Sequence, residues 1–208
     1  MSVATIQFRS PAMGRLISFQ AILPEVGEWP FPVLIQLHGL TDDGMAWIQR
    51  SNLVRYLQPY PFVTILPDGG TSAYLNWKAS ERLGRNNYED LIVVDIANHV
   101  RRHFNVTAGP WAIGGLSMGG YGAMRLGLKY PEMFASIWAH SSAFHIPDRL
   151  DPNLVVDTED ARVITHARKA AAAGTTQVIS FDCGVDDDLI GHNRELHTAM
   201  EELGLPHH

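Results

Sequence analysis

The most informative segment of the chain is Trp111-Ala112-Ile113-Gly114-Gly115-Leu116-Ser117-Met118-Gly119-Gly120. It joins an apolar, strand-like run to a helix-compatible stretch over Tyr121–Lys129. Gly-x-Ser-x-Gly in this setting is typical of a nucleophile elbow, a strained strand-to-helix turn that pushes the serine hydroxyl out at the top of a sheet. The same pattern can also be a glycine-rich turn with an ordinary serine. The strand before it and the helix after it favour Ser117 as a nucleophile, with the N–H of Met118 directed at an oxyanion.

A second element upstream matches the first. The apolar run Val33–Leu37 ends in His38-Gly39-Leu40. The α/β-hydrolase fold places its other oxyanion-hole donor after such a strand. Any strand that ends in a glycine turn could look like this, but together with Gly-x-Ser-x-Gly the pattern indicates the N–H of Leu40 as that donor. We expect His38 to position the loop and not to act as the base.

Composition is that of an ordinary globular protein. The chain has 208 residues, 46% hydrophobic and 18% charged, which suits one domain with a full core. A net charge of −6 gives no basic surface for nucleic acid. A single cysteine, Cys183, and an N-terminus without a signal-peptide pattern favour the cytoplasm. No apolar run is long enough to span a membrane, and we expect no membrane partner; a homo-oligomer is possible.

Strand and helix signals alternate along the chain, which predicts an α/β fold with a mainly parallel, doubly wound sheet. The expected strands cover 3–9, 16–23, 33–37, 62–66, 111–113, 135–140 and 177–181. The expected helices cover 45–57, 88–104, 121–129, 159–173 and 189–203. We expect a single domain over 1–208, in which 145–157 forms a short cap or lid.

An acid and a histidine should follow the serine in chain order. Three aspartates, Asp186, Asp187 and Asp188, follow the last expected strand. One of them could orient a histidine, although a run of aspartates also suits a helix N-terminus. The residues alone do not choose among the three.

The histidine is missing from its expected place. His192 and His197 fall within the last expected helix, and His207 and His208 come directly after it. A doubly wound hydrolase sheet would place one more strand, a histidine-bearing loop and a final helix there. We therefore expect the 208 residues to be truncated at the C-terminus, and we assign neither His207 nor His208 as the base.

Almost the whole chain resembles the esterase D family, also called the putative esterase family, whose members include tributyrin esterases, S-formylglutathione hydrolases and cinnamoyl esterases. The resemblance rests on residues 8–15, 37–43, 66–70, 115–122, Tyr74, Asn76-Trp77, 88–90, and Cys183-Gly184 followed by Asp187 and Leu189. It implies Ser117 as nucleophile, Asp187 as triad acid, and Leu40 and Met118 as oxyanion donors. It also implies a catalytic histidine about 25 to 30 residues beyond Asp187.

The activity that this implies is hydrolysis of a small ester through an acyl-enzyme, without metal or cofactor. We expect Trp47, Tyr74, Asn76 and Trp77 to bind substrate, although each aromatic could equally be core packing. The expected activity is that of a carboxylesterase for short acyl or aryl-acyl esters. A thioesterase of the S-formylglutathione hydrolase type, an acyltransferase, or a non-catalytic binding protein without the histidine are the alternatives.

Overall fold

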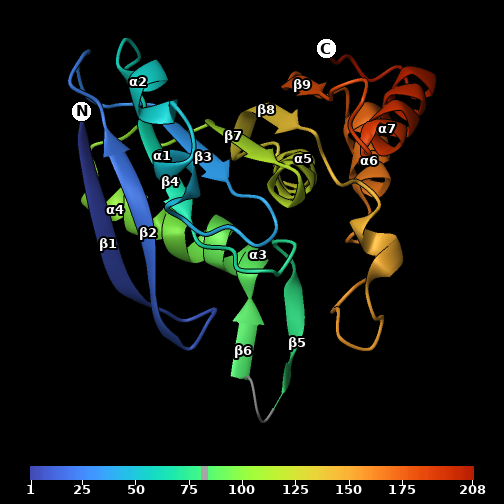
Figure 1. The fold of residues 1–208 in the computed structure, drawn as a ribbon, viewed down its shortest axis with the longest axis horizontal. Coiled ribbons are helices and arrows are strands. Elements are labelled where there is room, and N and C mark those ends of the chain that lie inside the picture. Colours follow the sequence, from blue (N-terminus) through green and yellow to red (C-terminus); the bar gives the residue numbers. More distant parts are fainter. Residues whose placement is uncertain (81–83) are drawn as a thin grey trace.

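The computed structural model describes residues 1–80 and 84–208, and its centre is a seven-stranded sheet in the order β1-β2-β4-β3-β7-β8-β9 (Figure 1). The first two strands pair antiparallel, β2 is antiparallel to β4, and the others are parallel. The predicted, mainly parallel sheet is therefore confirmed. Its strands are β1 (Ser2–Ser10), β2 (Arg15–Leu23), β3 (Val33–Leu37), β4 (Val63–Pro67), β7 (Trp111–Leu116), β8 (Phe134–His140) and β9 (Val178–Asp182).

The helices follow the expected alternation with differences in their bounds. They are α1 (Ala46–Gln49), α2 (Leu53–Leu57), α3 (Tyr88–Asp90), the π-helix η1 (Leu91–Ile96), α4 (Ala97–His103), α5 (Met118–Lys129), the 3-10 turn η2 (Ile146–Arg149), α6 (Val163–Ala173) and α7 (Ile190–Glu202). The expected helix over 88–104 is thus continuous but contains a π-helical stretch.

Two predicted helices are wrong in extent, and side chains that bond to the backbone explain both. The helix over 45–57 is two short helices, because the Ser51 hydroxyl bonds the Trp47 carbonyl and accepts the Leu53 N–H. Such local bonds compete with helical ones. The helix expected from residue 159 begins only at Val163, since the Asp157 carboxylate accepts backbone N–H groups that precede it.

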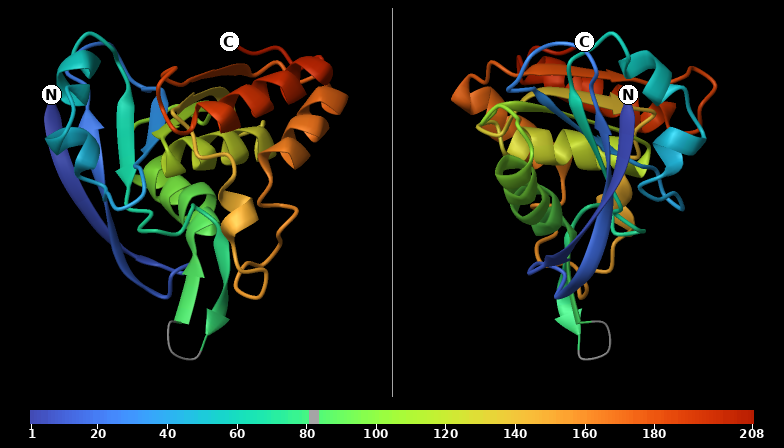
Figure 2. Two further views of the ribbon diagram at one scale, coloured as in Figure 1. Left: turned by 45° about the vertical axis from the view of Figure 1, so that its right-hand side comes forward. Right: turned by 90° about the vertical axis from the view of Figure 1, so that its left-hand side faces the viewer.

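Helix α5 packs on β7 and β8, and α6 packs on α5 (Figure 2). The approach is close, since a Cβ on Gly127 of α5 would lie 2.5 Å from the Ile137 side chain of β8. On the opposite face of β8, Trp138 is 51% exposed, and its indole N–H donates to the Asp182 carboxylate (2.9 Å). The core of this half of the molecule therefore lies between the sheet and α5.

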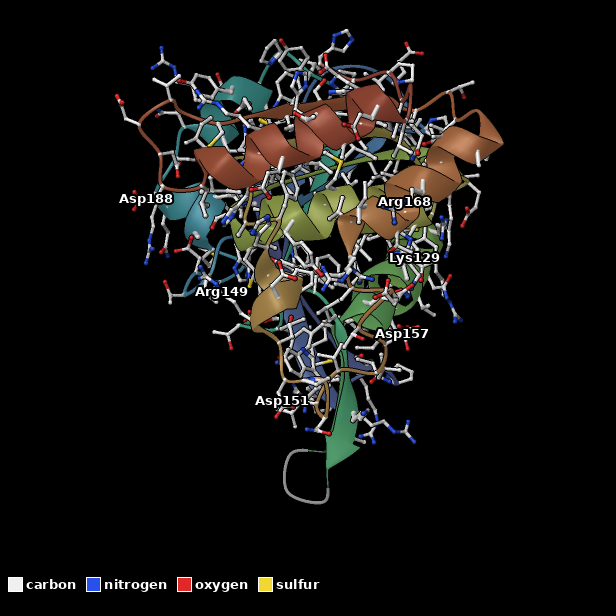
Figure 3. The ribbon with its side chains drawn as sticks, turned by 90° about the vertical axis from the view of Figure 1, so that its right-hand side faces the viewer. Lys129, Arg149, Asp151, Asp157, Arg168 and Asp188 are labelled. Atoms are coloured by element: carbon white, nitrogen blue, oxygen red, sulfur yellow. The ribbon has the colours of Figure 1, made fainter. Side chains whose placement is uncertain are left out.

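A two-stranded hairpin, β5 (Asn76–Ser80) and β6 (Gly84–Asn87), projects from the body of the molecule (Figure 2). An isolated bridge joins Trp77 to Val155 of the segment expected as a cap. In Figure 3, Arg149 and Asp151 of that segment lie on the side of the molecule that leads down to the hairpin. The sequence patterns did not predict this hairpin.

The carboxyl ends of the parallel strands meet at one edge of the sheet. Leu37 of β3 pairs with Gly115 of β7, and Leu116 pairs with His140 of β8, which pairs with Asp182 of β9. The loops after these strands therefore leave the sheet side by side, as in other open α/β sheets that bind ligands at this edge. No helix in the described part of the chain is long and apolar enough to cross a membrane.

Because α5 packs tightly against the end of β3, we expect one added methyl group at Gly119 to destabilise the fold. A Cβ on Gly119 would lie 2.5 Å from the Leu37 carbonyl oxygen and 2.6 Å from that of His38. We expect Gly119→Ala to lower the free energy of unfolding by about 1–3 kcal/mol or more. Gly191→Ala in α7, where a Cβ meets nothing within 4 Å, should be neutral or stabilising by up to about 1 kcal/mol. Urea unfolding compares them, and equal stabilities would contradict this packing.

Candidate active site

Ser117 occupies a strained turn between β7 and α5. Its φ is +56° and its ψ is −112°, a conformation that residues with side chains rarely adopt. The turn is held by the N–H of Ser117, which donates to the His140 carbonyl (2.9 Å), and by the Ser117 carbonyl, which accepts the N–H groups of Tyr121 and Ala143 (3.0 and 3.2 Å). The surrounding backbone therefore fixes the serine in a geometry that it would not adopt alone.

The two motif glycines are required by close backbone approaches. A Cβ on Gly115 would lie 2.2 Å from the Gly119 carbonyl oxygen, and one on Gly119 would collide with the end of β3. Ser117 itself is half-buried, and Met118 is the first residue of α5. The first N–H groups of a helix have no intrahelical partner, so they are free to bind an anion at this end.

The loop His38-Gly39-Leu40 lies against the Ser117 turn. A Cβ on Gly39 would be 3.8 Å from the Cβ of Ser117 and 3.6 Å from the Leu116 carbonyl oxygen. The Leu40 side chain is 55% exposed, so this loop is at the surface beside the serine. The structure thus brings the two sequence elements that suggested an oxyanion hole into contact.

His38 is buried and both of its ring nitrogens are bonded within the protein. Its Nε2 accepts the Gly69 N–H (2.8 Å), so Nδ1 carries the proton and donates to the Gly39 carbonyl (2.8 Å). With both nitrogens engaged, the ring is not free to take a proton from Ser117. This arrangement agrees with a loop-positioning residue.

The three aspartates differ in exposure. Asp187 is half-buried, whereas Asp186 and Asp188 are exposed; Figure 3 shows Asp188 on the loop that leads into α7. The Asp187 carboxylate accepts the Leu189 N–H (2.8 Å). All three lie on the loop after β9, at the same edge of the sheet as Ser117.

The four residues expected to bind substrate have different surroundings. The Trp47 indole is half-buried and donates to the Leu37 carbonyl (3.0 Å), and the Asn76 amide bonds Asp90 (2.9 Å). Trp77 lines a cleft of about 560 Å³ together with Tyr88. The structure differs from the expectation at Tyr74, which has no exposed surface and so lies beneath the site and not in a pocket.

None of the histidines that the structure describes hydrogen-bonds the Ser117 hydroxyl. His192 stacks on His145 (ring centroids 4.1 Å apart), whose Nε2 is 2.5 Å from the Glu195 carboxylate. His207 Nε2 is 2.8 Å from His197 Nδ1.

The last two histidines lie against the outer edge of β9. His208 bonds the backbone of Ile179 and Phe181, and the His207 ring stacks on Phe181. Because residue 208 pairs with β9 on its outer side, its backbone lies three strand spacings from β7, roughly 14 Å. His207 and His208 are therefore too far from Ser117 to take its proton directly.

A buried ionic network beneath the site was missed by the sequence patterns. Arg125 of α5 is fully buried and contacts the carboxylates of Glu89 (2.5 Å) and Asp160 (3.0 Å), and Lys129 contacts both as well. Burial alone would raise the pKa of Glu89, but the charge of Arg125 and hydrogen bonds from Lys129 and Tyr130 outweigh it and lower the pKa to about 2. One signal was available, since Arg125 interrupts an otherwise apolar helix.

In the part of the chain that the structure describes, no three His, Cys, Asp or Glu side chains are placed so that they could hold a metal ion.

Comparison with known proteins decides the family. The model of the family described as "Putative esterase" matches residues 10–203. The chain belongs to this family. An acetyl esterase of Caldicellulosiruptor saccharolyticus is 27% identical over 238 residues, which cover 99% of this chain and 88% of the relative. Esterase Rv1288 of Mycobacterium tuberculosis is 28% identical over 156 residues, 72% of this chain but only 34% of the relative.

Solved structures agree on the α/β-hydrolase fold. The fluorophosphonate-binding serine hydrolase FphF of Staphylococcus aureus superposes with a TM-score of 0.86 at 21% identity, covering 99% of this esterase-family chain and 88% of its own. The S-formylglutathione hydrolase FrmB of the same organism gives 0.82 at 20%, with the same coverage. A ferulic acid esterase gives 0.81 at 25%, covering 99% and 87%. The predicted fold class and family are both confirmed.

Proposed function

We propose that the chain is a serine carboxylesterase that hydrolyses short acyl or aryl-acyl esters through an acyl-enzyme on Ser117. The observation that carries the proposal is the strained Ser117 turn placed directly against the His38-Gly39-Leu40 loop. This juxtaposition supports a nucleophile with a two-part oxyanion hole. It also distinguishes the site from an ordinary glycine-rich turn, which needs no second loop beside it.

The proposed reaction has two halves. In the first, Ser117 Oγ attacks the ester carbonyl, the N–H groups of Leu40 and Met118 bind the oxyanion, and the alcohol leaves. In the second, water attacks the acyl-serine and releases the acid. Loss of one oxyanion donor in such a site typically slows the reaction by about 100- to 1,000-fold.

Asp187 is the proposed acid of the triad, and its half-buried position between two exposed aspartates supports it. Its role is to orient an imidazole and to stabilise the imidazolium. The proton acceptor must be an imidazole at the Ser117 hydroxyl, a place that none of the described histidines takes.

The names of relatives support the substrate class without fixing it. They include an acetyl esterase, a ferulic acid esterase and S-formylglutathione hydrolases. An acetyl or feruloyl ester fits a carboxylesterase. A thioesterase of the S-formylglutathione hydrolase type is the second candidate, and FrmB favours it.

Removal of the Ser117 hydroxyl tests whether this residue is the nucleophile. We expect Ser117→Ala to lose both hydrolysis of 4-nitrophenyl acetate and labelling by a fluorophosphonate probe, because the hydroxyl that forms the proposed acyl-enzyme is gone. Ser136→Ala, a half-buried serine within β8, should behave like the original chain. Steady-state rates and mass spectrometry of the labelled peptide measure this. Labelling at another serine, or full activity in Ser117→Ala, would show that the nucleophile is elsewhere.

The proton acceptor is tested by chemical rescue. Because no described histidine reaches Ser117, we expect added imidazole to raise the rate of the 208-residue chain in a saturable way. The rate of the Ser117→Ala variant in imidazole measures the direct reaction of imidazole with the ester, and this background rate is subtracted. If imidazole adds nothing beyond that background while the chain is active, a base is already in place and the geometry given for the histidines is incomplete.

The acyl pocket should favour short chains. The segment expected as a cap, 145–157, is short and its helical part is the four-residue turn η2, so it is too small to enclose a long acyl chain. We expect kcat/KM for 4-nitrophenyl butyrate to exceed that for the palmitate ester, measured below the concentration at which palmitate forms micelles. A clear preference for palmitate would refute the short-acyl assignment.

A further inference from the structure

Tyr74 has a conformation and surroundings that a simple core residue does not need. It is fully buried, and both it and Ala73 have positive φ values, 55° and 56°. Such backbone is strained in residues other than glycine and persists only where the surroundings impose it. The sequence patterns suggested substrate contact for this residue, which its burial does not allow.

The tyrosine ring is fixed on two sides. A Cβ on Gly69 would lie 2.3 Å from the ring, and one on Gly122 of α5 would lie 2.6 Å from it. The Tyr74 carbonyl accepts a hydrogen bond from the buried Arg125 guanidinium (3.0 Å). Ring and backbone are therefore held against the helix that follows Ser117, with little freedom left for the hydroxyl.

The Tyr74 hydroxyl donates to the His38 carbonyl (2.9 Å). Burial raises the pKa of Tyr74 well above its usual value of 10.0, so the hydroxyl stays a donor. The bond thus holds the peptide group that joins His38 to Gly39. The C=O and N–H of a trans peptide group point in opposite directions, so fixing the carbonyl also fixes the direction of the Gly39 N–H.

The next peptide group is fixed by the His38 ring. Its Nδ1 donates to the Gly39 carbonyl, which belongs to the same peptide group as the Leu40 N–H. The ring in turn packs edge-on against Tyr74, with centroids 5.8 Å apart. Gly39 has no Cβ to restrict rotation. These two bonds, together with the Asp42 N–H that donates to the Gly39 carbonyl (3.2 Å), therefore hold the consecutive peptide groups in their orientation.

We propose that Tyr74 is a positioning residue for the oxyanion loop: its hydroxyl clamps the His38–Gly39 peptide group and so keeps the Leu40 N–H directed at Ser117. The inference rests on the proposed function of this loop. Tyr74 touches no substrate and acts only through the backbone that it holds. Preorganised donors of this kind stabilise charge in the transition state and not in the bound substrate.

The test compares Tyr74→Phe with Tyr121→Phe. Tyr121 is equally buried, and its hydroxyl also donates to a backbone carbonyl, that of Ala161 (2.6 Å), away from the loop. The Tyr121 contact that holds the Ser117 turn is made by its backbone N–H, which phenylalanine keeps. Both variants lose one buried hydrogen bond and should lose similar stability in urea unfolding. We expect only Tyr74→Phe to lower kcat for 4-nitrophenyl acetate, by about 5- to 10-fold with KM unchanged. Hydrogen–deuterium exchange of the 38–40 amides should also rise only in Tyr74→Phe.

The outcomes separate the clamp from the proposed function. Unchanged exchange of the 38–40 amides in Tyr74→Phe, or equal losses of kcat in both variants, would overturn the clamp. If Ser117→Ala keeps full activity, the proposed function fails, while exchange still reports whether Tyr74 holds the loop. Faster exchange of these amides without a fall in kcat would mean that the loop is clamped but is not the oxyanion hole.

Discussion

The approach of the α5 N-terminus to the end of β3 is the constraint on which the site depends. The backbone of Gly119 lies so close to the carbonyls of Leu37 and His38 that no side chain fits between them. With the helix start fixed there, the chain leaves β7 through the strained turn at Ser117, with φ at +56°. The same contact holds the loop after β3 beside the serine. One packing contact thus sets both halves of the proposed oxyanion hole.

Buried side chains beneath the site hold the strained Ser117 turn in place. Arg125 and Tyr74 link α5 to the loop after β3, and Glu89 and Asp160 neutralise the buried guanidinium. Removing one partner of such a buried pair leaves an uncompensated charge, so the network acts as a unit. The strained backbone at residues 73, 74 and 117 lies around this network and the site above it. This distribution is common where rigid geometry has to serve chemistry.

Much of the fold could be predicted because it follows from local patterns. Alternating strand and helix signals indicated the parallel sheet, and glycine spacing around Ser117 indicated the turn. The helix over 45–57 was wrong because Ser51 interrupts it by bonding the backbone, a choice that apolar spacing does not reveal.

The sequence predicted a residue of the candidate site only where that residue belongs to a recognisable local motif, as Ser117 does. The role of Tyr74 depends on contacts with Gly122 and His38, which lie far from it in sequence. A single sequence does not distinguish a tyrosine buried in the core from one that lines a pocket. The Arg125 network could not be predicted for the same reason, since its carboxylate partners come from two other segments.

A crystal structure of the chain after reaction with a small phosphonate ester, which mimics the tetrahedral intermediate, would show the proposed oxyanion hole directly. We predict phosphorus on Ser117 Oγ and a phosphonyl oxygen about 2.7–3.1 Å from the backbone nitrogens of both Leu40 and Met118. A phosphonate on another residue, or one on Ser117 whose oxygen points to solvent away from these two N–H groups, would contradict it.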